Sequence, residues 1–117
     1  MSAQYVIKNG ELIVADQAGV SVYNKAMFFD FVVYSNIKVV RGKMFLPELE
    51  IEKLLESAEI IDLPHPFTQE QIMAWMEKLI QKNNLQDALV RLLLIGPEKD
   101  SEAMLFLFPV GLTFYPD

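Results

Sequence analysis

Two short apolar runs on either side of an Asn-Gly pair at the start of the chain predict a β-hairpin. Two short, largely apolar runs, residues 5–8 and 11–14, flank the pair Asn9 and Gly10. An Asn-Gly pair supplies the positive φ angles that a two-residue type I′ turn requires. Residues 16–19 then have the composition of a loop. The chain is therefore expected to open with two short antiparallel strands.

A second apolar region, residues 28–40, is rich in Phe, Val, Tyr and Ile. Aromatic and β-branched side chains fit a pleated, half-buried surface, so this region is expected to be a strand. Residues 41–43, Arg-Gly-Lys, then turn the chain, and residues 44–46 are expected to return as another strand.

The apolar period changes from that of a strand to that of a helix at Pro47. Proline is tolerated in the first helical turn, and the acidic residues that follow suit the positive end of a helix dipole. The apolar residues recur at helical spacing: Ile51, Leu54, Leu55, Ala58 and Ile61. This pattern predicts one amphipathic helix of roughly four turns that ends before Pro64.

A second amphipathic helix is expected from Thr68 to the pair Asn83-Asn84. Thr68 and Gln71 have the spacing of a capping box, and Phe67 with Ile72 has that of a hydrophobic staple. The apolar face consists of Ile72, Met73, Met76, Leu79 and Ile80. Methionines and Trp75 at this spacing could line a ligand groove, but we interpret them as core residues.

Two apolar strands are expected to close the chain. The first is residues 88–95, and the second combines residues 103–108 with 110–115 after a hairpin loop at 96–100. Nearly continuous apolar runs are typical of strands in the middle of a covered sheet. The sequence therefore predicts a single α+β domain, residues 1–117, with an antiparallel sheet of about six strands and two amphipathic helices packed on one side.

Composition and charge exclude several classes of protein. The net charge is −6 and no basic cluster is present, which disfavours a nucleic acid partner. No apolar stretch approaches the roughly 20 residues of a membrane-spanning helix, and the N-terminus does not resemble a signal peptide. With no cysteine, the chain has no disulfide and no thiolate site, so we expect a cytoplasmic protein. The single histidine, His65, is expected to lie exposed in a connector and not to bind a metal.

The residues alone offer little catalytic chemistry. The carboxylates of the first helix are expected to form a solvated stripe, at Glu48, Glu52, Glu56 and Glu59, and not an acid/base pair. There is no glycine-rich phosphate loop, and no serine has a histidine placed for a catalytic triad. Arg91 is the more informative residue, because it is a charge within an apolar strand. Three interpretations stay open: a structural ion pair, a position facing solvent, and an anion-binding arginine that faces a cleft.

The succession of segments resembles the fold-type IV pyridoxal-phosphate (PLP) enzymes over essentially the whole chain. That family comprises branched-chain aminotransferases, D-amino acid aminotransferases and aminodeoxychorismate lyases. The similar segments include the 8–11 hairpin, 20–27 (VSVYNKAM), 37–45 (IKVVRGKMF), 67–72 (FTQEQI), 83–88 (NNLQDA) with 90–92 (VRL), and the linker-like 115–117 (YPD).

The resemblance implies a small N-terminal domain that normally precedes a larger one. In the family the Schiff-base lysine and most PLP contacts lie in the large domain, which the 117-residue chain lacks. We therefore expect no catalytic residue here, no PLP binding by this chain alone, and no activity of the isolated chain. The resemblance assigns Lys53 to the PLP phosphate, and Arg91 and Tyr34 to the substrate.

The candidate active-site edge departs from the family pattern. Two glycines of the family are replaced by Asp30 and Val32, and a glutamate is replaced by Ser35. A histidine and the phosphate-binding arginine that follows it by three residues align with Glu50 and Lys53. Lysine can meet a phosphate as a point charge but not as a bidentate fork. In addition, the tyrosine that usually precedes the arginine at Arg91 by two residues is Leu89.

Two functions from different classes are compatible with this sequence. The chain is either the N-terminal domain of a divergent PLP-dependent aminotransferase, or a non-catalytic relative that serves as a dimerisation or binding module. An isolated small domain would expose a face that its missing large domain covers in the family, and exposed apolar patches mark interfaces. We therefore expect a homo-oligomer, a dimer, that associates through the strand-rich surface.

Overall fold

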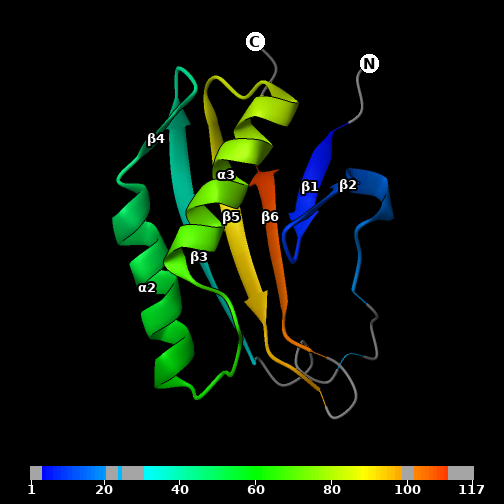
Figure 1. Cartoon of the computed structure of the whole chain (residues 1–117), viewed down its shortest axis with the longest axis vertical. Coiled ribbons are helices and arrows are strands. Elements are labelled where there is room, and N and C mark those ends of the chain that lie inside the picture. Colours follow the sequence, from blue (N-terminus) through cyan, green and yellow to red (C-terminus); the bar gives the residue numbers. More distant parts are fainter. Residues whose placement is uncertain (1–3, 21–23, 25–30, 99–101, 111–117) are drawn as a thin grey trace.

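The computed structural model describes residues 4–20, 24, 31–98 and 102–110, which form one antiparallel sheet covered on one face by two helices (Figure 1). The order of the strands in the sheet is β2-β1-β6-β5-β3-β4. The strands are β1 (Tyr5–Lys8), β2 (Glu11–Val14), β3 (Val32–Val40), β4 (Lys43–Phe45), β5 (Ala88–Ile95) and β6 (Met104–Val110). The helices are α2 (Pro47–Ile60) and α3 (Gln69–Asn83). This confirms the expected α+β fold.

The first hairpin has the expected type I′ geometry and is anchored to the centre of the sheet. Asn9 and Gly10 have φ angles of 52° and 88°. The Asn9 side-chain Oδ1 accepts a hydrogen bond of 2.7 Å from the Leu105 amide, and the Asn9 amide donates one of 2.8 Å to the Leu105 carbonyl. The indole of Trp75 on α3 lies directly over Gly10. These contacts place β1 beside β6, with β2 outside β1, and hold the hairpin turn beneath α3.

Both helices begin close to where the sequence places them. In α3 the full capping box forms, because Thr68 Oγ1 accepts from the Gln71 amide and the Gln71 side chain accepts from the Thr68 amide. In α2 Pro47 occupies the first turn, but Leu46 is the N-cap with left-handed φ and ψ angles of 47° and 50°. The expectation that Leu46 continues the returning strand is therefore wrong, since the chain reverses into the helix there.

The main core lies between the helices and one face of the sheet. Strand residues alternate, so that Ile37, Val90, Leu92, Leu105 and Leu107 point toward the helices and are fully buried. They meet an apolar layer from the helices: Ile51, Leu54, Ala58, Ile72, Met76 and Leu79. Met73 and Trp75 pack against this cluster, which confirms that the methionines and the tryptophan belong to the core.

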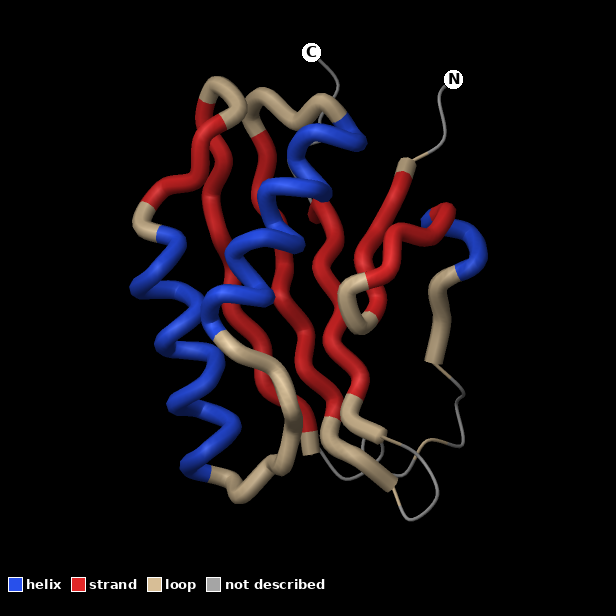
Figure 2. Tube along the Cα trace, viewed as in Figure 1, coloured by secondary structure: helices blue, strands red, loops and turns tan. Residues whose placement is uncertain are grey.

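Both α2 and α3 lie on one side of the sheet (Figure 2), and we call the other side, which neither of them covers, the open face. Its residues alternate with those of the core, and the central part carries Tyr34, Asn36, Arg91, Leu93, Phe106 and Phe108. A smaller cluster forms there around Ile95 and Phe106, with Ala18 and Val20 packed against it. The connection after β2 therefore crosses part of the open face, while the region around Arg91 belongs to the sheet surface itself.

The strand boundaries differ from the predicted ones at three places. The strand expected over 28–40 begins at Val32: Phe31 is described but lies outside β3, and residues 28–30 lie outside the described residues. The last strand runs through Pro109 to Val110, and residues 111–115 lie outside the described part. Proline is tolerated there because, among the described residues, β6 pairs with β1 at Phe106 and Leu107 but not at Pro109. The expected loop at 16–19 begins instead with a short 3₁₀ turn at Ala15–Gln17.

Candidate functional site

The candidate site is centred on Arg91, in the middle of β5 on the open face of the sheet. Its cross-strand partners are Asn36 in β3 and Phe108 in β6. Residues directly opposite one another in an antiparallel sheet have Cβ atoms about 5 Å apart, so the three side chains form one row across the face. Arg91 is half-buried. The strand order therefore places a guanidinium between an amide and an aromatic ring.

Two neutral side chains hold the Arg91 guanidinium. Its Nε donates a hydrogen bond of 3.1 Å to the Oδ1 of Asn36. Its Cζ lies 4.9 Å from the centre of the Tyr34 ring, which is a cation–π distance. Within the described part of the chain no carboxylate forms a salt bridge with Arg91, which rules out a structural ion pair among those residues. The two partners, an amide and an aromatic ring, are neutral and do not compensate the charge themselves.

The electrostatics of the open face suit an anion. In β3, β5 and β6 the only charged residues are Lys38 and Arg91, and these strands contain no Asp or Glu. On the helix side, by contrast, α2 alone carries five glutamates. A cation in a partly buried, apolar setting attracts a negatively charged ligand more strongly than a cation that is surrounded by water.

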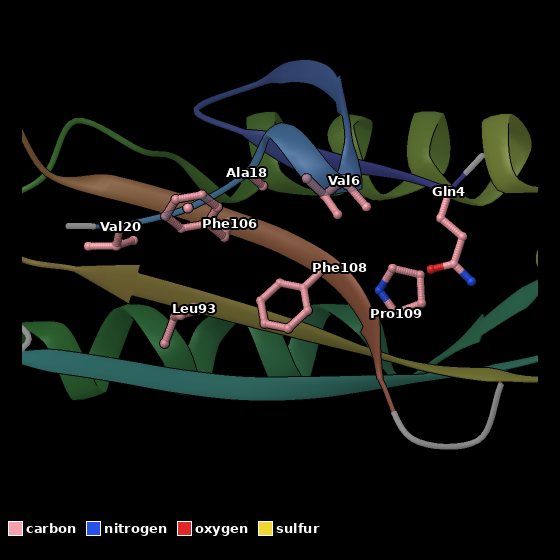
Figure 3. Close-up of a pocket in the computed structure, with 10 residues that line it drawn as sticks. Gln4, Val6, Ala18, Val20, Leu93, Phe106, Phe108 and Pro109 are labelled. Atoms are coloured by element: carbon pink, nitrogen blue, oxygen red, sulfur yellow. The ribbon is translucent and has the colours of Figure 1, made fainter. Parts of the chain in front are cut away.

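An apolar groove of about 320 Å³ adjoins this row on the open face (Figure 3). Leu93, Phe106 and Phe108 form its floor, and the segment from Ala15 to Val20 forms one wall. Phe108 is also the cross-strand neighbour of Arg91. A ligand with one carboxylate and one apolar arm can therefore contact the guanidinium and the groove together.

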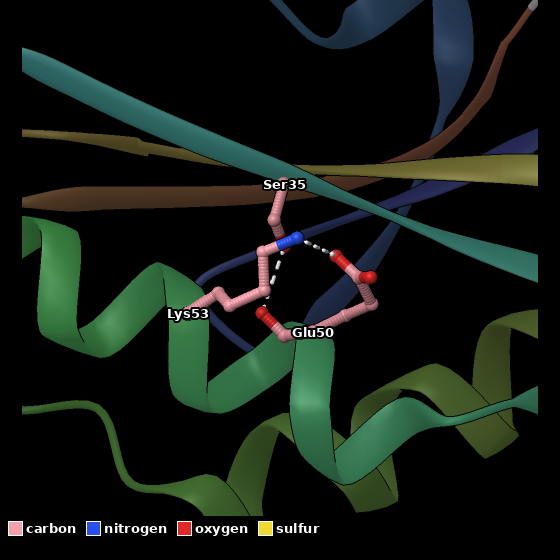
Figure 4. A network of polar contacts seen from close by, with 3 residues as sticks. All are labelled: Ser35, Glu50 and Lys53. Atoms are coloured by element: carbon pink, nitrogen blue, oxygen red, sulfur yellow. Dashed lines mark hydrogen bonds and ion pairs between the residues drawn. The ribbon is translucent and has the colours of Figure 1, made fainter.

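Lys53, the candidate contact for the PLP phosphate, lies on the other side of the sheet, on α2 (Figure 4). Its Nζ is 3.6 Å from the Glu50 carboxylate, and its side chain is 59% exposed. The Ser35 hydroxyl donates a hydrogen bond of 3.0 Å to the backbone carbonyl of Glu50. Since Ser35 faces α2 and Tyr34 faces away from it, the structure brings Tyr34 and Arg91 together and leaves Lys53 apart.

The surroundings of Lys53 offer the phosphate of PLP only a weak contact. A phosphate site needs several donors, and α2 offers one ammonium among five glutamates. The expected solvated stripe of Glu48, Glu52, Glu56 and Glu59 is fully exposed on this helix. The lysine is already paired, and the hydroxyl of Ser35 is committed to a backbone carbonyl. A phosphate at Lys53 would therefore have to compete with Glu50 in a negative field.

His65 differs from the expected exposed connector residue. It is half-buried, its ring stacks on Phe67 at 5.8 Å, and its Nδ1 accepts a hydrogen bond of 3.0 Å from the Phe67 amide. Burial lowers the pKa of the His65 imidazole below its usual range. The described residues hold no group of three or more His, Asp or Glu that could bind a metal. His65 therefore closes the turn that precedes α3.

Sequence reasoning missed Asn36, the one side chain that forms a hydrogen bond with Arg91 in the described structure. Its position in an apolar strand was visible, but its partner depends on the register between β3 and β5, which are separated by two helices. Of the two positions at which the family has glycine, Asp30 and Val32, the structure describes only the second. Asp30 lies outside the described residues, whereas Val32 opens β3 and packs against the Ile95 cluster.

Comparisons with known proteins find aminotransferases among the relatives of this chain. No protein-family model matches the chain. It is 33% identical over 87 residues to a probable branched-chain-amino-acid aminotransferase of Rickettsia bellii, which covers 74% of this chain and 30% of that protein. It is 32% identical over 80 residues to a D-alanine aminotransferase of Listeria monocytogenes, covering 68% and 28%. The branched-chain amino acid aminotransferase of Thermobaculum terrenum in its PLP form has a similar fold, with a TM-score of 0.78, 19% identity and coverage of 92% and 39%.

These similarities define the class of protein to which the fold and the site belong. The chain is related to the fold-type IV aminotransferases and corresponds to the N-terminal portion of its relatives. It belongs to the group of branched-chain and D-amino acid aminotransferases as their N-terminal small domain, and it spans about 30% of the length of the curated relatives it matches. Among the described residues, no helix is long and apolar enough to cross a membrane.

Proposed function

We propose that this chain supplies the substrate-side wall of the active site in a class IV PLP-dependent aminotransferase, which transfers an amino group between an amino acid and a 2-oxo acid. Arg91 binds the substrate carboxylate, and Tyr34 lies against the guanidinium and the substrate. The observation that carries this proposal is the Arg91 guanidinium on the open face, with an amide and a ring as partners and no carboxylate paired with it among the described residues.

The chemistry of the proposed substrates supports this assignment. Both partners of the transfer, an amino acid and a 2-oxo acid, carry a carboxylate, and arginine binds carboxylates through two parallel hydrogen bonds. The groove over Leu93, Phe106 and Phe108 has the apolar lining that an aliphatic side chain requires. One row of side chains thus offers both a carboxylate contact and an apolar contact.

The PLP cofactor supplies the electron sink for amino-group transfer when it is bound. Lys53 is the residue of this chain that we propose as a contact for its phosphate. The contact is weakened because Glu50 must first release the ammonium. An exposed pair of this kind stabilises the protein by only about 0–1 kcal/mol, so displacement is feasible but the remaining contact is poor. By itself the chain is therefore not expected to hold PLP.

The experiment follows from the placement of Arg91. The reading frame downstream of Asp117 is determined, and the encoded protein is loaded with PLP and assayed for transfer from a branched-chain amino acid to a 2-oxo acid. Arg91→Ala is expected to raise KM or lower kcat/KM by roughly 10- to 100-fold, the value of a lost charge-assisted contact of about 1.5–3 kcal/mol. Lys78→Ala, on exposed α3, is the matched control for loss of a cation. Equal rates in the two variants would contradict the role of Arg91.

A second candidate function is a non-catalytic dimerisation or binding module. The pairing of Lys53 with Glu50 favours it, because the residue aligned with the phosphate-binding arginine is already neutralised. A stop codon at residue 118, together with no borohydride-reducible lysine adduct after incubation of the chain with PLP, would support this function. A downstream domain and a specific adduct in the longer protein would support the enzyme.

We also propose that the chain is cytoplasmic and forms a homodimer through its strand-rich surface. Large apolar side chains are exposed at the β3–β4 edge and the adjacent start of α2: Tyr34, Val40, Phe45, Leu46 and Leu49. Such patches are typical of interfaces. Light scattering over a range of concentrations tests the dimer, with Phe45→Glu expected to shift the mass toward that of the monomer. A monomeric mass for the unchanged chain at every concentration would refute it.

A further inference from the structure

Asn36 stands in a position where it controls which donors of Arg91 a ligand can reach. It lies directly opposite Arg91 in the register of β3 and β5. Its Oδ1 accepts the Nε–H of Arg91 at 3.1 Å. The amide is neutral, so it orients the guanidinium without cancelling its charge. An aspartate in this place would orient the same group and neutralise it.

The contacts of Arg91 limit which of its donors a ligand can use in pairs. A guanidinium has five N–H groups, one on Nε and two on each of the terminal nitrogens. Asn36 occupies the Nε donor, and the Tyr34 ring lies 4.9 Å from Cζ and covers one face. A side-on carboxylate would need the Nε donor, which is taken. Only the end-on edge, formed by Nη1 and Nη2, offers two parallel hydrogen bonds.

We propose that Asn36 is a positioning residue that presents Arg91 end-on to the carboxylate of a ligand with a single carboxylate and an apolar arm. The arm lies along the groove floored by Leu93, Phe106 and Phe108, next to the row that contains Arg91. This inference rests on the proposed role of Arg91 as the substrate contact and adds the residue that sets its orientation. It also defines the ligand class: a dicarboxylate would place a second charge on an apolar floor, so an apolar monocarboxylate binds in preference.

Charge around the row supports an anionic ligand. Arg91 and Lys38 are the only charged residues of β3, β5 and β6, and Lys38 follows Asn36 by two residues on the same face. Diagonal neighbours in a sheet are about 7–8 Å apart at their Cα atoms, so Lys38 adds to the positive potential without competing for Asn36. No carboxylate of these strands opposes a bound anion.

The test uses the 117-residue chain with 4-methylpentanoate as the probe and butanedioate as the dicarboxylate comparison. Binding is followed by the ¹H and ¹⁵N shifts of the Arg91 Nε–Hε group, which report directly on the Asn36 hydrogen bond. The variants are Asn36→Ala and Asn36→Asp, and Gln81→Ala, an exposed amide on α3, is the control. Urea unfolding of each variant measures stability separately from binding.

The unchanged chain is expected to bind 4-methylpentanoate more tightly than butanedioate. Asn36→Asp should keep the Hε signal protected from exchange but lower the affinity for 4-methylpentanoate by about tenfold or more. The reason is that the new carboxylate pairs with the guanidinium and neutralises its charge. Asn36→Ala should expose Hε to rapid exchange and weaken the probe by roughly threefold, since the freed guanidinium must be ordered on binding. Gln81→Ala should change neither measurement.

The outcomes separate this inference from the proposed function. If Arg91→Ala abolishes probe binding while both Asn36 variants bind like the unchanged chain, Asn36 does not position Arg91, and the role of Arg91 stands. If Arg91→Ala binds the probe normally, or the unchanged chain does not bind it, the assignment of Arg91 as the carboxylate contact fails. An Hε signal in rapid exchange in the unchanged chain overturns the inference without any ligand. If Asn36 had only a structural role, Asn36→Asp would lower the free energy of unfolding and the affinity for the probe together. The positioning role instead predicts that the affinity falls while the Hε signal stays protected.

Discussion

Replacing Gly10 by alanine tests how α3 and the first hairpin are held together. Gly10 has a φ angle of 88° in the type I′ turn, a region that residues with a side chain rarely adopt. A Cβ atom at this position would lie 2.6 Å from Cζ2 and 2.7 Å from Cε2 of Trp75. Both distances are far below a van der Waals contact. The substitution therefore combines backbone strain with a collision against the indole.

The expected magnitude can be separated into these two parts. A left-handed backbone conformation costs an L-residue about 1–2 kcal/mol. Forcing an added methyl group into a packed site costs about 1–3 kcal/mol more. Gly42 provides the matched control, because its φ angle is 78° but the nearest atom to an added Cβ, the Leu85 carbonyl oxygen, is at an ordinary 3.6 Å. Gly10→Ala should therefore destabilise the chain by about 2–5 kcal/mol and Gly42→Ala by only the backbone part.

Urea unfolding followed by circular dichroism measures both variants. The decisive comparison repeats Gly10→Ala in a Trp75→Leu background, where the indole atoms nearest to the new Cβ are gone. There the added cost of Gly10→Ala should fall to that of Gly42→Ala. If Gly10→Ala is as mild as Gly42→Ala in the unchanged chain, or if its cost is the same with and without Trp75, the packing of the indole on the turn is refuted.

Three further predictions concern the caps and turns around α3. Thr68→Ala removes the hydroxyl of the capping box and should cost about 1 kcal/mol in urea unfolding. Asn83→Ala removes both 2.8 Å hydrogen bonds to the Tyr5 backbone, so the Tyr5 amide should exchange with solvent faster, whereas an unchanged rate would contradict this tie between α3 and β1. Burial lowers the pKa of His65, so the unfolded chain binds the proton more tightly than the folded chain. The contribution of His65 to the free energy of unfolding should therefore be fully present above pH 6.5 and decrease as the pH falls below the ordinary value of 6.5. His65→Gln should flatten that part of the pH dependence relative to the unchanged chain.

Much of the fold could be predicted because the signals are local. The Asn9-Gly10 turn, the capping box of Thr68 and the helical spacing of Ile51 to Ala58 each act within a few residues. The structure has all three where the sequence placed them. Features that failed are those in which a distant part of the molecule decides. Leu46 is the N-cap of α2 because the chain reverses direction there, between the end of β4 and the helix. Pro109 stays within β6 because, among the described residues, β1 does not pair with it.

The candidate site was predictable only in part, for the same reason. The charge of Arg91 inside an apolar strand marked the residue, and alternation in the strand could assign it to a face. Its partner could not be found, because Asn36 is 55 residues away in sequence and meets Arg91 only through the register of β3 and β5. The half-buried state of His65 was equally hidden, since it depends on how the turn before α3 folds onto Phe67.

Strand alternation also imposes a condition on any ligand that would use both candidate contacts. Tyr34 and Ser35 are adjacent in β3, so one faces Arg91 and the other faces α2, which carries Lys53. The sheet separates the two groups everywhere except at an edge. Among the described residues β4 pairs only with positions 38–40 of β3, so residues 32–37 form a free edge. A molecule that contacts Lys53 and Arg91 together must therefore pass around that edge. It can do so only along residues 32–37, where β3 is not paired with β4.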